Sequence, residues 1–297
     1  MDKDIIRDFL DLKQIKWSES MLGSECTTFK TGGRLKLFCE PDTLFKAAEL
    51  MLFAHENDIR HFLIGNGSNL LIRDEGSDML FIRLSGELTK FRLEGGRLIC
   101  GAGASFAAAS KYSVAQGFMG LEWATGIPGT VGGAIAMNAS AYGGETKTCL
   151  TWLTGVRDGE TVSLAPDKDA MGYRVSPYSF PKMAVLEAVF ELLPDDGGAK
   201  ERMEQYTKKR KASQPLNYPS AGSTFKRPTG YYAGALIEQA GLKGLRVGGA
   251  SVSEKHAGFI INDAGATSGD VLELMELVKQ RVFERFGVTL EPEVIIL

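Results

Sequence analysis

The segment ATGIPGTVGGAIAMNASAYGG, residues 124–144, differs in composition from the rest of this chain. It holds six glycines and no charged residue, although charged residues make up 24% of the sequence. Glycine lets a ligand approach the main chain closely, because it has no side chain in the way. A phosphate group repels carboxylates, so a segment without Asp and Glu suits a phosphate. The composition therefore indicates main chain that lies against a bound anionic ligand.

Two shorter glycine turns lie upstream of this segment. GNGSN (residues 65–69) and GAG (residues 101–103) each follow a short apolar run. Neither has the G-x-G-x-x-G spacing of dinucleotide-binding folds, because the third glycine position falls on Leu70 and on Phe106. Consecutive amides in such turns can still form an anion nest, and a helix start adds a positive dipole end. We predict a diphosphate cradle built from several turns, and ordinary connector glycines are the alternative that the residues alone leave open.

The overall charge points away from nucleic acids and membranes. The chain has 297 residues, a length typical of two domains, with a net charge of −3 and a pI of about 5.8. A nucleic-acid partner normally requires a basic surplus, and the basic run at 208–211 is better explained as a solvated helix end. The amphipathic start is not a secretory signal, and residues 124–144 are too polar for a membrane helix. We expect a cytoplasmic protein without membrane insertion.

Metal and hydrolase chemistry receive little support from the sequence. The four cysteines are scattered and form no C-x-x-C pair, which indicates reduced thiols. The three histidines form no H-E-x-x-H motif, and no G-x-S-x-G elbow is present. We therefore expect no metal site.

The hydrophobic pattern predicts an α+β fold, because strands and helices mix without regular alternation. Strands are expected at 35–38, 62–64, 70–72 and 98–100, and helices from Pro41, over 104–116 and over 267–286. Thr267 and Asp270 form a capping-box pattern at the start of the last helix. The segment PDDGG, residues 194–198, is the best candidate for a linker between domains.

Three isolated residues are candidate site residues, but their local sequence does not decide a function. Ser223 lies in the small-residue turn PSAGSTFKRP, Arg174 lies between aromatic residues in GYRVSPYSF, and Glu293 lies in LEPEV. Arginine is a natural clamp for a carboxylate, whereas a surface arginine stacked on Tyr173 explains the same pattern. Ser223 taken alone is a turn residue, and Glu291 and Glu293 fit the protective charges of an edge strand as well as a re-aimed active-site pair.

Taken together, eight segments resemble the family of UDP-N-acetylenolpyruvoylglucosamine reductases. They run in the family's order: FKTGG, IGNGSNLLI, GIPGTVGGAIAMNASAYGGE, YRVSPYSF, PSAGSTFKRP, GALIEQAGLKG, HAGFIIN and FGVTLEPEV. They span nearly the whole chain from Phe29 onward. Each segment alone is weak, but eight in register are highly specific.

The resemblance implies the FAD-binding fold of the vanillyl-alcohol oxidase type with a smaller α+β substrate-binding domain. The FAD-binding domain is expected over residues 1–195, as two α+β subdomains split near 85–95, and the substrate-binding domain over 199–297. FAD is expected to be non-covalent, because the three histidines lie outside the glycine turns, and NADPH is the expected reductant. The expected FAD-binding residues are Gly65, Asn66, Gly67, Ser68, Asn69, Gly126, Ile127, Pro128, Gly129, Thr130, Gly132, Gly133 and Asn138.

The family's reaction reduces the enolpyruvyl ether of UDP-N-acetylglucosamine to UDP-N-acetylmuramate, a step of peptidoglycan precursor synthesis. Hydride passes from NADPH by way of FAD to the enol carbon distal to the carboxylate. The resemblance implies that Ser223 gives a proton to the carbon beside the carboxylate, and that Arg174 and Glu293 stabilise the enolate-like charge. Glu293 then needs to hold or share a proton, as a partly buried site allows. Substrate contacts are expected from Tyr173, Lys226 and Arg227.

Two departures mark the shorter subtype of the family. The interval from Arg174 to Ser223 is too short for the inserted tyrosine loop of longer members, and Arg227 stands where they typically have asparagine. Rival hypotheses are an FAD-dependent oxidase of the same fold, acting on a hydroxyl group, and a flavin-free nucleotide-sugar binding module. A yellow purified protein excludes the last. We expect a monomer whose partner is a small UDP-sugar substrate.

Overall fold

The computed structural model describes residues 3–297, and the chain divides into two compact units. Unit 1 comprises residues up to 19, 37–65 and 78–209, and unit 2 comprises 20–36, 66–77 and 210–297. Each unit has its own cluster of buried hydrophobic side chains. Unit 2 is therefore assembled from three stretches that lie far apart in the sequence.

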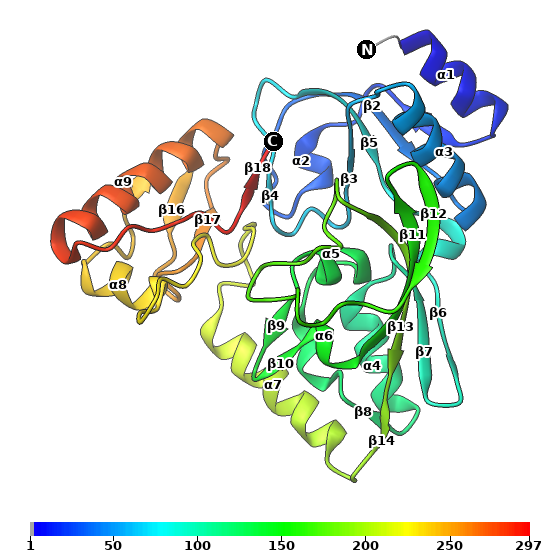
Figure 1. Cartoon of the computed structure of the whole chain (residues 1–297). Helices are drawn as coiled ribbons and strands as arrows, with labels where there is room; N and C mark the ends of the chain where they lie inside the picture. The colour runs from blue at the N-terminus through cyan, green and yellow to red at the C-terminus, as the bar shows by residue number, and fades with distance from the viewer. Residues whose placement is uncertain (1–2) are drawn as a thin grey trace. The chain divides into compact units, whose positions relative to one another are not determined.

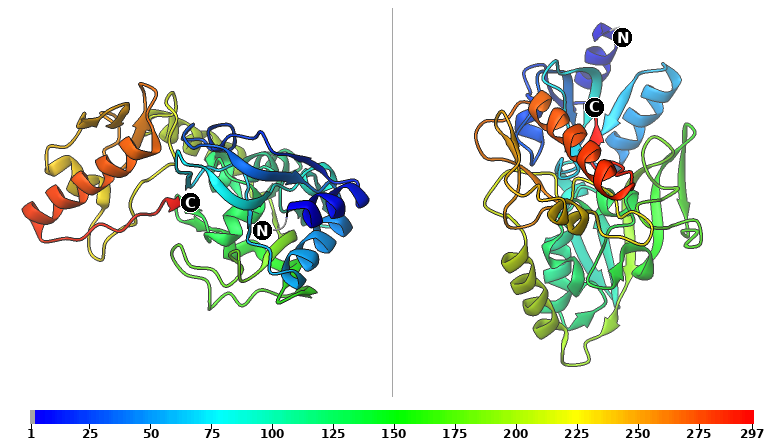
Figure 2. Two further views of the ribbon diagram at one scale, coloured as in Figure 1. Left: turned by 90° about the horizontal axis from the view of Figure 1, so that it is seen from above. Right: turned by 90° about the vertical axis from the view of Figure 1, so that its left-hand side faces the viewer.

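The first sheet of unit 1 has the strand order β1-β2-β5-β3. Its strands are β1 (Lys16–Ser18), β2 (Leu35–Glu40), β5 (Ser77–Ile82) and β3 (His61–Leu63), and the first residues of β2 and β5 belong to unit 2. Helices α1 (Lys3–Leu12) and α3 (Leu44–Glu56) lie side by side (Figure 1, Figure 2). The rings of Phe9 and Phe53 stack between them at 4.0 Å. Thr43 caps the start of α3 by accepting the N–H of Lys46.

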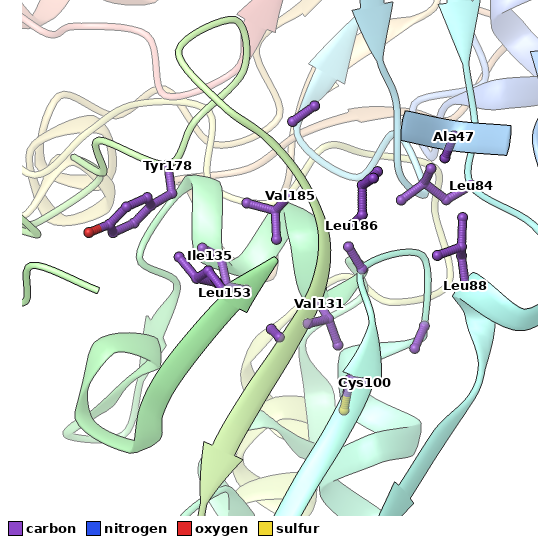
Figure 3. Close-up of a cluster of buried hydrophobic side chains, with 14 of the residues drawn as sticks. Ala47, Leu84, Leu88, Cys100, Val131, Ile135, Leu153, Tyr178, Val185 and Leu186 are labelled. Atoms are coloured by element: carbon purple, nitrogen blue, oxygen red, sulfur yellow. The ribbon is translucent and has the colours of Figure 1, made fainter. Parts of the chain in front are cut away.

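The second sheet of unit 1 is antiparallel and has the order β12-β11-β13-β7-β6. Its strands are β12 (Glu160–Leu164), β11 (Leu150–Arg157), β13 (Ala184–Glu191), β7 (Arg97–Gly101) and β6 (Phe91–Glu94). Helices α4 (Phe106–Ala115) and α5 (Val131–Ala136) pack against this sheet. Figure 3 shows Val131 and Ile135 of α5 packed among side chains of β13, β11 and β7. The start of α5, which lies within the glycine-rich segment of residues 124–144, is thus held by the core.

Short elements complete unit 1. They are η1 (Gly86–Thr89), β8 (Phe118–Met119), η2 (Glu122–Gly126), β9 (Ser140–Ala141), β10 (Gly144–Glu145), α6 (Thr146–Cys149), β14 (Leu193–Pro194) and most of α7 (Ala199–Ser213).

Unit 2 is built around a small antiparallel sheet and one long helix. The sheet consists of β15 (Arg246–Val247), β16 (Ala250–Val252) and β17 (Ile260–Asn262), and α9 (Ser268–Phe286) lies across it (Figure 1, Figure 2). The remaining elements are α2 (Gly23–Cys26), α8 (Ala233–Gln239) and the parallel pair β4 (Leu70–Leu71) and β18 (Ile295–Ile296). Phe29 and Leu71, from the two early stretches, are fully buried in its core. Those stretches are therefore part of this unit's hydrophobic core.

Most of the expected elements are confirmed. The capping box at the start of α9 is present, since Thr267 accepts the N–H of Asp270 and Asp270 accepts that of Thr267. The predicted helix over 104–116 begins slightly later, at Phe106, and Gly117 follows its end with a φ of +81°. The mixture of helices with mainly antiparallel sheets confirms the α+β class.

Residues 194–198, which we expected to form a linker between domains, are held by specific contacts. Leu193 and Pro194 pair with β8, and the Asp195 carboxylate accepts the N–H groups of Gly197 and Ala199 as the chain enters α7. Arg202 of α7 also pairs with the buried carboxylate of Glu122 at 2.7 Å. Because these contacts anchor α7, the division between the compact units falls after Lys209 rather than at the boundary expected between 195 and 199.

Candidate active site

The three glycine turns meet in unit 1. A Cβ atom on Gly65 would lie 2.5 Å from Thr130 Oγ1, so the main chain of the first turn touches the third. A Cβ atom on Gly132 would lie 3.1 Å from the Cβ of Ala102, so the second turn touches the third as well. The first turn follows β3, the second follows β7, and the third precedes α5. Glycine permits their close approach because it has no side chain. The three turns therefore contact one another, as the predicted site built from several turns requires.

One part of that prediction needs correction. The N–H groups of Val131 and Gly132 donate to the carbonyls of Ala104 and Ala102, each at 2.8 Å. The N–H of Gly133 donates to Thr130 Oγ1 at 3.2 Å. These amides at the start of α5 are occupied within the protein, so the helix start is not the donor set that we expected. Gly132 and Gly133 remain candidates through their lack of a side chain.

The charge around the glycine turns suits an anionic group such as the diphosphate of FAD. The nearest carboxylate in the sequence after the uncharged segment is that of Glu145, which accepts a hydrogen bond from Asn138 Nδ2 at 3.0 Å. Lys147 Nζ lies 3.8 Å from the same carboxylate. Because this negative charge is compensated locally and the turns themselves carry none, the residues present fit a diphosphate.

The remaining residues of the GNGSN turn belong to unit 2. Gly67 has a φ of +62°, and a Cβ atom there would lie 2.1 Å from the carbonyl oxygen of Cys26, so glycine is required on both counts. Asn69 donates from Nδ2 to the carbonyl of Glu293 at 3.1 Å, and its own carbonyl accepts the N–H of Ile295 at 3.0 Å. The turn that we expected to bind the cofactor therefore also holds the main chain around Glu293, which the sequence analysis missed.

Unit 2 brings the segments of Ser223 and Glu293 together. The N–H of Glu293 donates to the carbonyl of Thr224 at 2.8 Å, and Phe225 and Pro292 form an isolated antiparallel bridge. Ser223 is exposed and Glu293 is half-buried. The strand expected through LEPEV is thus reduced to this bridge, since regular pairing begins only with β18. Two segments that lie 70 residues apart in the sequence therefore run side by side.

The cations expected near Ser223 have partners within unit 2. Lys226 Nζ lies 3.3 Å from a carboxylate oxygen of Glu291, and its N–H donates to the Glu291 carbonyl at 2.8 Å. The Arg227 guanidinium lies 4.8 Å from the centre of the Tyr232 ring. Both side chains reach solvent, so neither contact removes them from a ligand.

Arg174 lies at the tip of a tight turn in unit 1. Gly172 and Val175 exchange main-chain hydrogen bonds of 3.0 and 3.2 Å, and Arg174 between them has a φ of +57°. Its guanidinium lies 4.9 Å from the centre of the Tyr173 ring and donates to Ser140 Oγ at 3.3 Å. The stacking on Tyr173 that the sequence suggested is confirmed. A non-glycine residue in this backbone region is strained, and such strain is concentrated at functional sites.

Asn138 is placed differently from what the sequence led us to expect. Its side chain is 1% exposed and makes hydrogen bonds to Glu145 and to the Gly172 carbonyl through Nδ2, and to the Lys147 N–H through Oδ1. Both N–H bonds and the oxygen are engaged inside the unit. A cofactor contact from this residue would therefore have to come from its main chain.

His256 lies in the turn that supports the segment of Ser223. Its Nδ1 accepts the N–H of Gly258 at 3.2 Å, and the Gly258 carbonyl accepts the N–H of Thr224 at 2.9 Å. Burial lowers the pKa of this imidazole.

Within residues 3–297, no group of three or more His, Cys, Asp and Glu side chains is arranged to hold a metal ion. No helix in the same range has the length and apolar content needed to cross a bilayer.

Comparison with known proteins identifies the family. Residues 214–297 match the model of the C-terminal domain of UDP-N-acetylenolpyruvoylglucosamine reductase, and residues 35–165 match a model of an FAD binding domain. A protein of this name from Exiguobacterium sibiricum is 45% identical over 90% of this chain and 88% of its own length. The chain belongs to the UDP-N-acetylenolpyruvoylglucosamine reductase family. A second relative, from Syntrophomonas wolfei, is 40% identical over 97% of both chains.

A solved structure agrees with this assignment. The crystal structure of UDP-N-acetylenolpyruvylglucosamine reductase from Thermus caldophilus superimposes with a TM-score of 0.81 at 35% sequence identity. The match covers 95% of this chain and 98% of that one. The FAD-binding fold and the flavoenzyme class inferred for this reductase family member from its sequence are therefore confirmed.

Proposed function

We propose that this protein reduces UDP-N-acetylglucosamine enolpyruvate to UDP-N-acetylmuramate, with FAD as the cofactor and NADPH as the reductant. Three relatives that carry the reductase name each match at least 90% of the chain at 40% identity or more. The observation that carries the proposal is the pairing in unit 2 that brings the segment of Ser223 beside the segment of Glu293. Reduction of a carbon–carbon double bond next to a carboxylate requires a proton donor and a group that stabilises charge, and this pair supplies both.

FAD, when bound, supplies the hydride-transfer chemistry between NADPH and the enolpyruvyl double bond. The residues proposed to hold it are those of the glycine turns that meet at Gly65, Ala102 and Thr130, together with the rest of GNGSN and of GIPGT. These turns bring main chain rather than side chains to the cofactor. Their lack of carboxylates favours the diphosphate.

The reaction adds a hydride to the enol carbon distal to the carboxylate and a proton to the carbon beside it. We assign the proton to the Ser223 hydroxyl, which is exposed in its turn. Arg174 is assigned to the carboxylate of the substrate, because a guanidinium pairs with a carboxylate through two parallel hydrogen bonds. Glu293 is assigned to the same developing charge. A hydroxyl is a weak acid, so these charge-stabilising groups are needed for its proton transfer.

The UDP portion of the substrate is assigned to Tyr173, Lys226 and Arg227. Lys226 and Arg227 supply positive charge in unit 2, and Tyr173 supplies a half-exposed ring in unit 1. We further propose that residues up to 195 serve mainly for FAD, that 199–297 serve mainly for the substrate, and that the protein works as a cytoplasmic monomer. The UDP-sugar is its proposed small-molecule partner.

An anaerobic experiment in two steps tests the function. The purified protein should be yellow, lose its flavin absorbance on addition of NADPH, and recover it when UDP-N-acetylglucosamine enolpyruvate is added without oxygen. A matched sample that receives UDP-N-acetylglucosamine should stay bleached. Recovery only on admission of oxygen would overturn the proposal and favour an oxidase of the same fold. A colourless protein that binds no added FAD would favour a nucleotide-sugar binding module.

A further inference from the structure

We propose that Asn138 is a positioning residue for Arg174, which it acts on through the turn of residues 172–175. The proposal rests on the function given above, in which Arg174 stabilises the charge that develops on the substrate. It replaces the cofactor contact expected of the Asn138 side chain with a role in the second half of the reaction.

The contacts of Asn138 leave its side chain no freedom. Nδ2 donates to the Gly172 carbonyl at 3.1 Å and to the Glu145 carboxylate at 3.0 Å, and Oδ1 accepts the Lys147 N–H at 3.0 Å. The residue is 1% exposed, so its side-chain amide has almost no access to water. A buried side-chain amide whose hydrogen-bonding groups are all satisfied is held in one orientation, and its removal takes one hydrogen bond from each of its three partners.

The hydrogen bond from Asn138 to Gly172 ends at the base of the turn that carries Arg174. Gly172 is the residue that pairs with Val175, so the position of its carbonyl fixes the two residues at the tip. Lys147 reinforces the same base, because its Nζ donates to the Met171 carbonyl at 2.7 Å while its N–H is held by Asn138. The contact from Asn138 to this turn therefore spans 34 residues of sequence.

Backbone strain supports a functional reason for this arrangement. Asn138, Tyr142 and Arg174 all have positive φ angles, of 38°, 52° and 57°. Asparagine tolerates this region better than other residues with a side chain, but arginine and tyrosine do not. A strained arginine persists only when its surroundings determine its position. Asn138 below the turn and Ser140, which accepts from the guanidinium, provide those surroundings.

The test separates the two half-reactions in rapid-mixing experiments on the full-length protein with FAD bound. In Asn138→Ala, we expect FAD affinity and the rate of flavin bleaching by NADPH to stay within about threefold of the wild type. The rate of recovery with the enolpyruvyl substrate should fall on the order of 10–100-fold, since a small misplacement of a catalytic group has effects of this size. Thr146→Val is the matched control, because Thr146 is equally buried and bonds to Ala139 but not to Gly172. It should recover at the wild-type rate.

A double-mutant cycle with Arg174→Met shows whether Asn138 acts through Arg174. If it does, Asn138→Ala combined with Arg174→Met should recover no more slowly than Arg174→Met alone. Full additivity of the two losses, or an equal loss in both half-reactions, would overturn the proposal. So would weaker FAD binding in Asn138→Ala, which would restore the cofactor role.

A second variant covers the case in which Asn138→Ala does not fold. Asn138→Asp keeps the size of the side chain and the acceptor for Lys147, but it cannot donate to Gly172. It should show the same selective slowing of the recovery step, and a wild-type rate in this variant would contradict the proposal. If the wild type itself does not recover with the enolpyruvyl substrate, the proposed function fails instead, so the two failures are distinguishable.

Discussion

Ser223 is positioned by the hydrogen bonds of the residue that follows it. The neighbouring Thr224 donates to Gly258 and accepts from Glu293, and its side-chain oxygen accepts the N–H of Ile260 at 3.0 Å. Thr224 is 1% exposed, whereas Ser223 is exposed. The chain thus buries one hydroxyl as a structural anchor and presents the next one to solvent. This local alternation fits a proton donor that must be fixed and accessible together.

We expect Ser223→Ala to lose only the second half-reaction. The flavin absorbance should fall with NADPH at the wild-type rate, because the serine has no part in that step. Recovery with the enolpyruvyl substrate should slow by on the order of 10²–10⁴, the usual contribution of a positioned general acid. Stopped-flow absorbance measures both rates. Ser220→Ala in the same turn is the control, and a wild-type recovery rate in Ser223→Ala would remove the proton-donor assignment.

His256 predicts a pH dependence of stability. Burial lowers the pKa of this imidazole below the usual 6.5, and nearby Glu238 and Lys243 act on it in opposite directions. As the pH falls below about 6.5, the unfolded chain takes up a proton more readily than the folded chain, so the free energy of unfolding decreases. The contribution of neutral His256 to stability is present above that pH and is lost as the pH falls toward the pKa of the folded state. Protonation would also remove Nδ1 as the acceptor for Gly258.

His256→Asn should weaken this dependence, because an amide oxygen can accept from Gly258 without titrating in this range. Urea unfolding at several pH values between 7.5 and 5.5 measures the slope in both proteins. The free energy of unfolding should change more steeply with pH in the wild type than in His256→Asn. The difference between the two slopes should be no more than about 1.4 kcal/mol per pH unit, the limit for one proton. His61, whose pKa burial also lowers, is present in both proteins and cancels. Equal slopes would show that His256 titrates alike in the folded and unfolded states.

At the scale of elements, α9 shows how a local signal stabilises unit 2. The Thr267 side chain accepts the N–H of Asp270 at 3.0 Å, and the Asp270 carboxylate accepts the N–H groups of Thr267 and Gly249. These main-chain bonds lower the pKa of Asp270. The cap therefore both begins the helix and ties it to the turn that joins β15 and β16.

Thr267→Ala should lower the free energy of unfolding by about 1 kcal/mol, the usual loss when a capping hydroxyl is removed. Thr267→Ser keeps the hydroxyl and should retain most of the stability. Urea unfolding followed by circular dichroism gives both values. An alanine variant as stable as the serine variant would mean that the packing of α9, with Val271 and Leu274 fully buried, alone determines where the helix begins.

At the scale of the whole molecule, unit 2 depends on stretches far from its main segment. Phe29 and Leu71 are fully buried in its core, Asn262 donates to the Phe29 carbonyl at 3.0 Å, and β4 pairs with β18. Asp74 caps α9 from outside by accepting the N–H groups of Ser268 and Gly269. The part of the chain matched by the C-terminal family model, residues 214–297, therefore lacks part of its own core.

A fragment of residues 210–297 should accordingly fail to fold cooperatively. Its exposed apolar surface lacks the partners that Phe29 and Leu71 provide, and its edge strand lacks β4. A single chain that joins residues 20–36, 66–77 and 210–297 through short flexible linkers should unfold in one transition. Thermal melting by circular dichroism and the dispersion of amide proton signals compare the two. A dispersed spectrum and a sharp transition in the short fragment would contradict this account.

The sequence by itself determined the local elements and the family of this protein. The capping box of Thr267 and Asp270, the turn at Gly117 and the uncharged glycine segment are short-range features, so the order of the residues specifies them. Ser223, Arg174 and Glu293 were identified by resemblance rather than by periodicity. The residues alone leave their alternatives as turn, surface and edge residues open.

Only the tertiary structure decided how those residues are held. Asn69 supports Glu293 across 224 residues of sequence, and Asn138 supports the turn of Arg174 across 34. A side-chain amide that bonds a distant carbonyl has no periodic pattern in the sequence, because its partner is fixed by packing and chain closure rather than by spacing. For the same reason, the sequence did not predict that unit 2 is assembled from three stretches or that Glu122 anchors α7. Short-range features follow from the order of the residues, whereas the support of the proposed catalytic groups depends on contacts that exist only once the chain has folded.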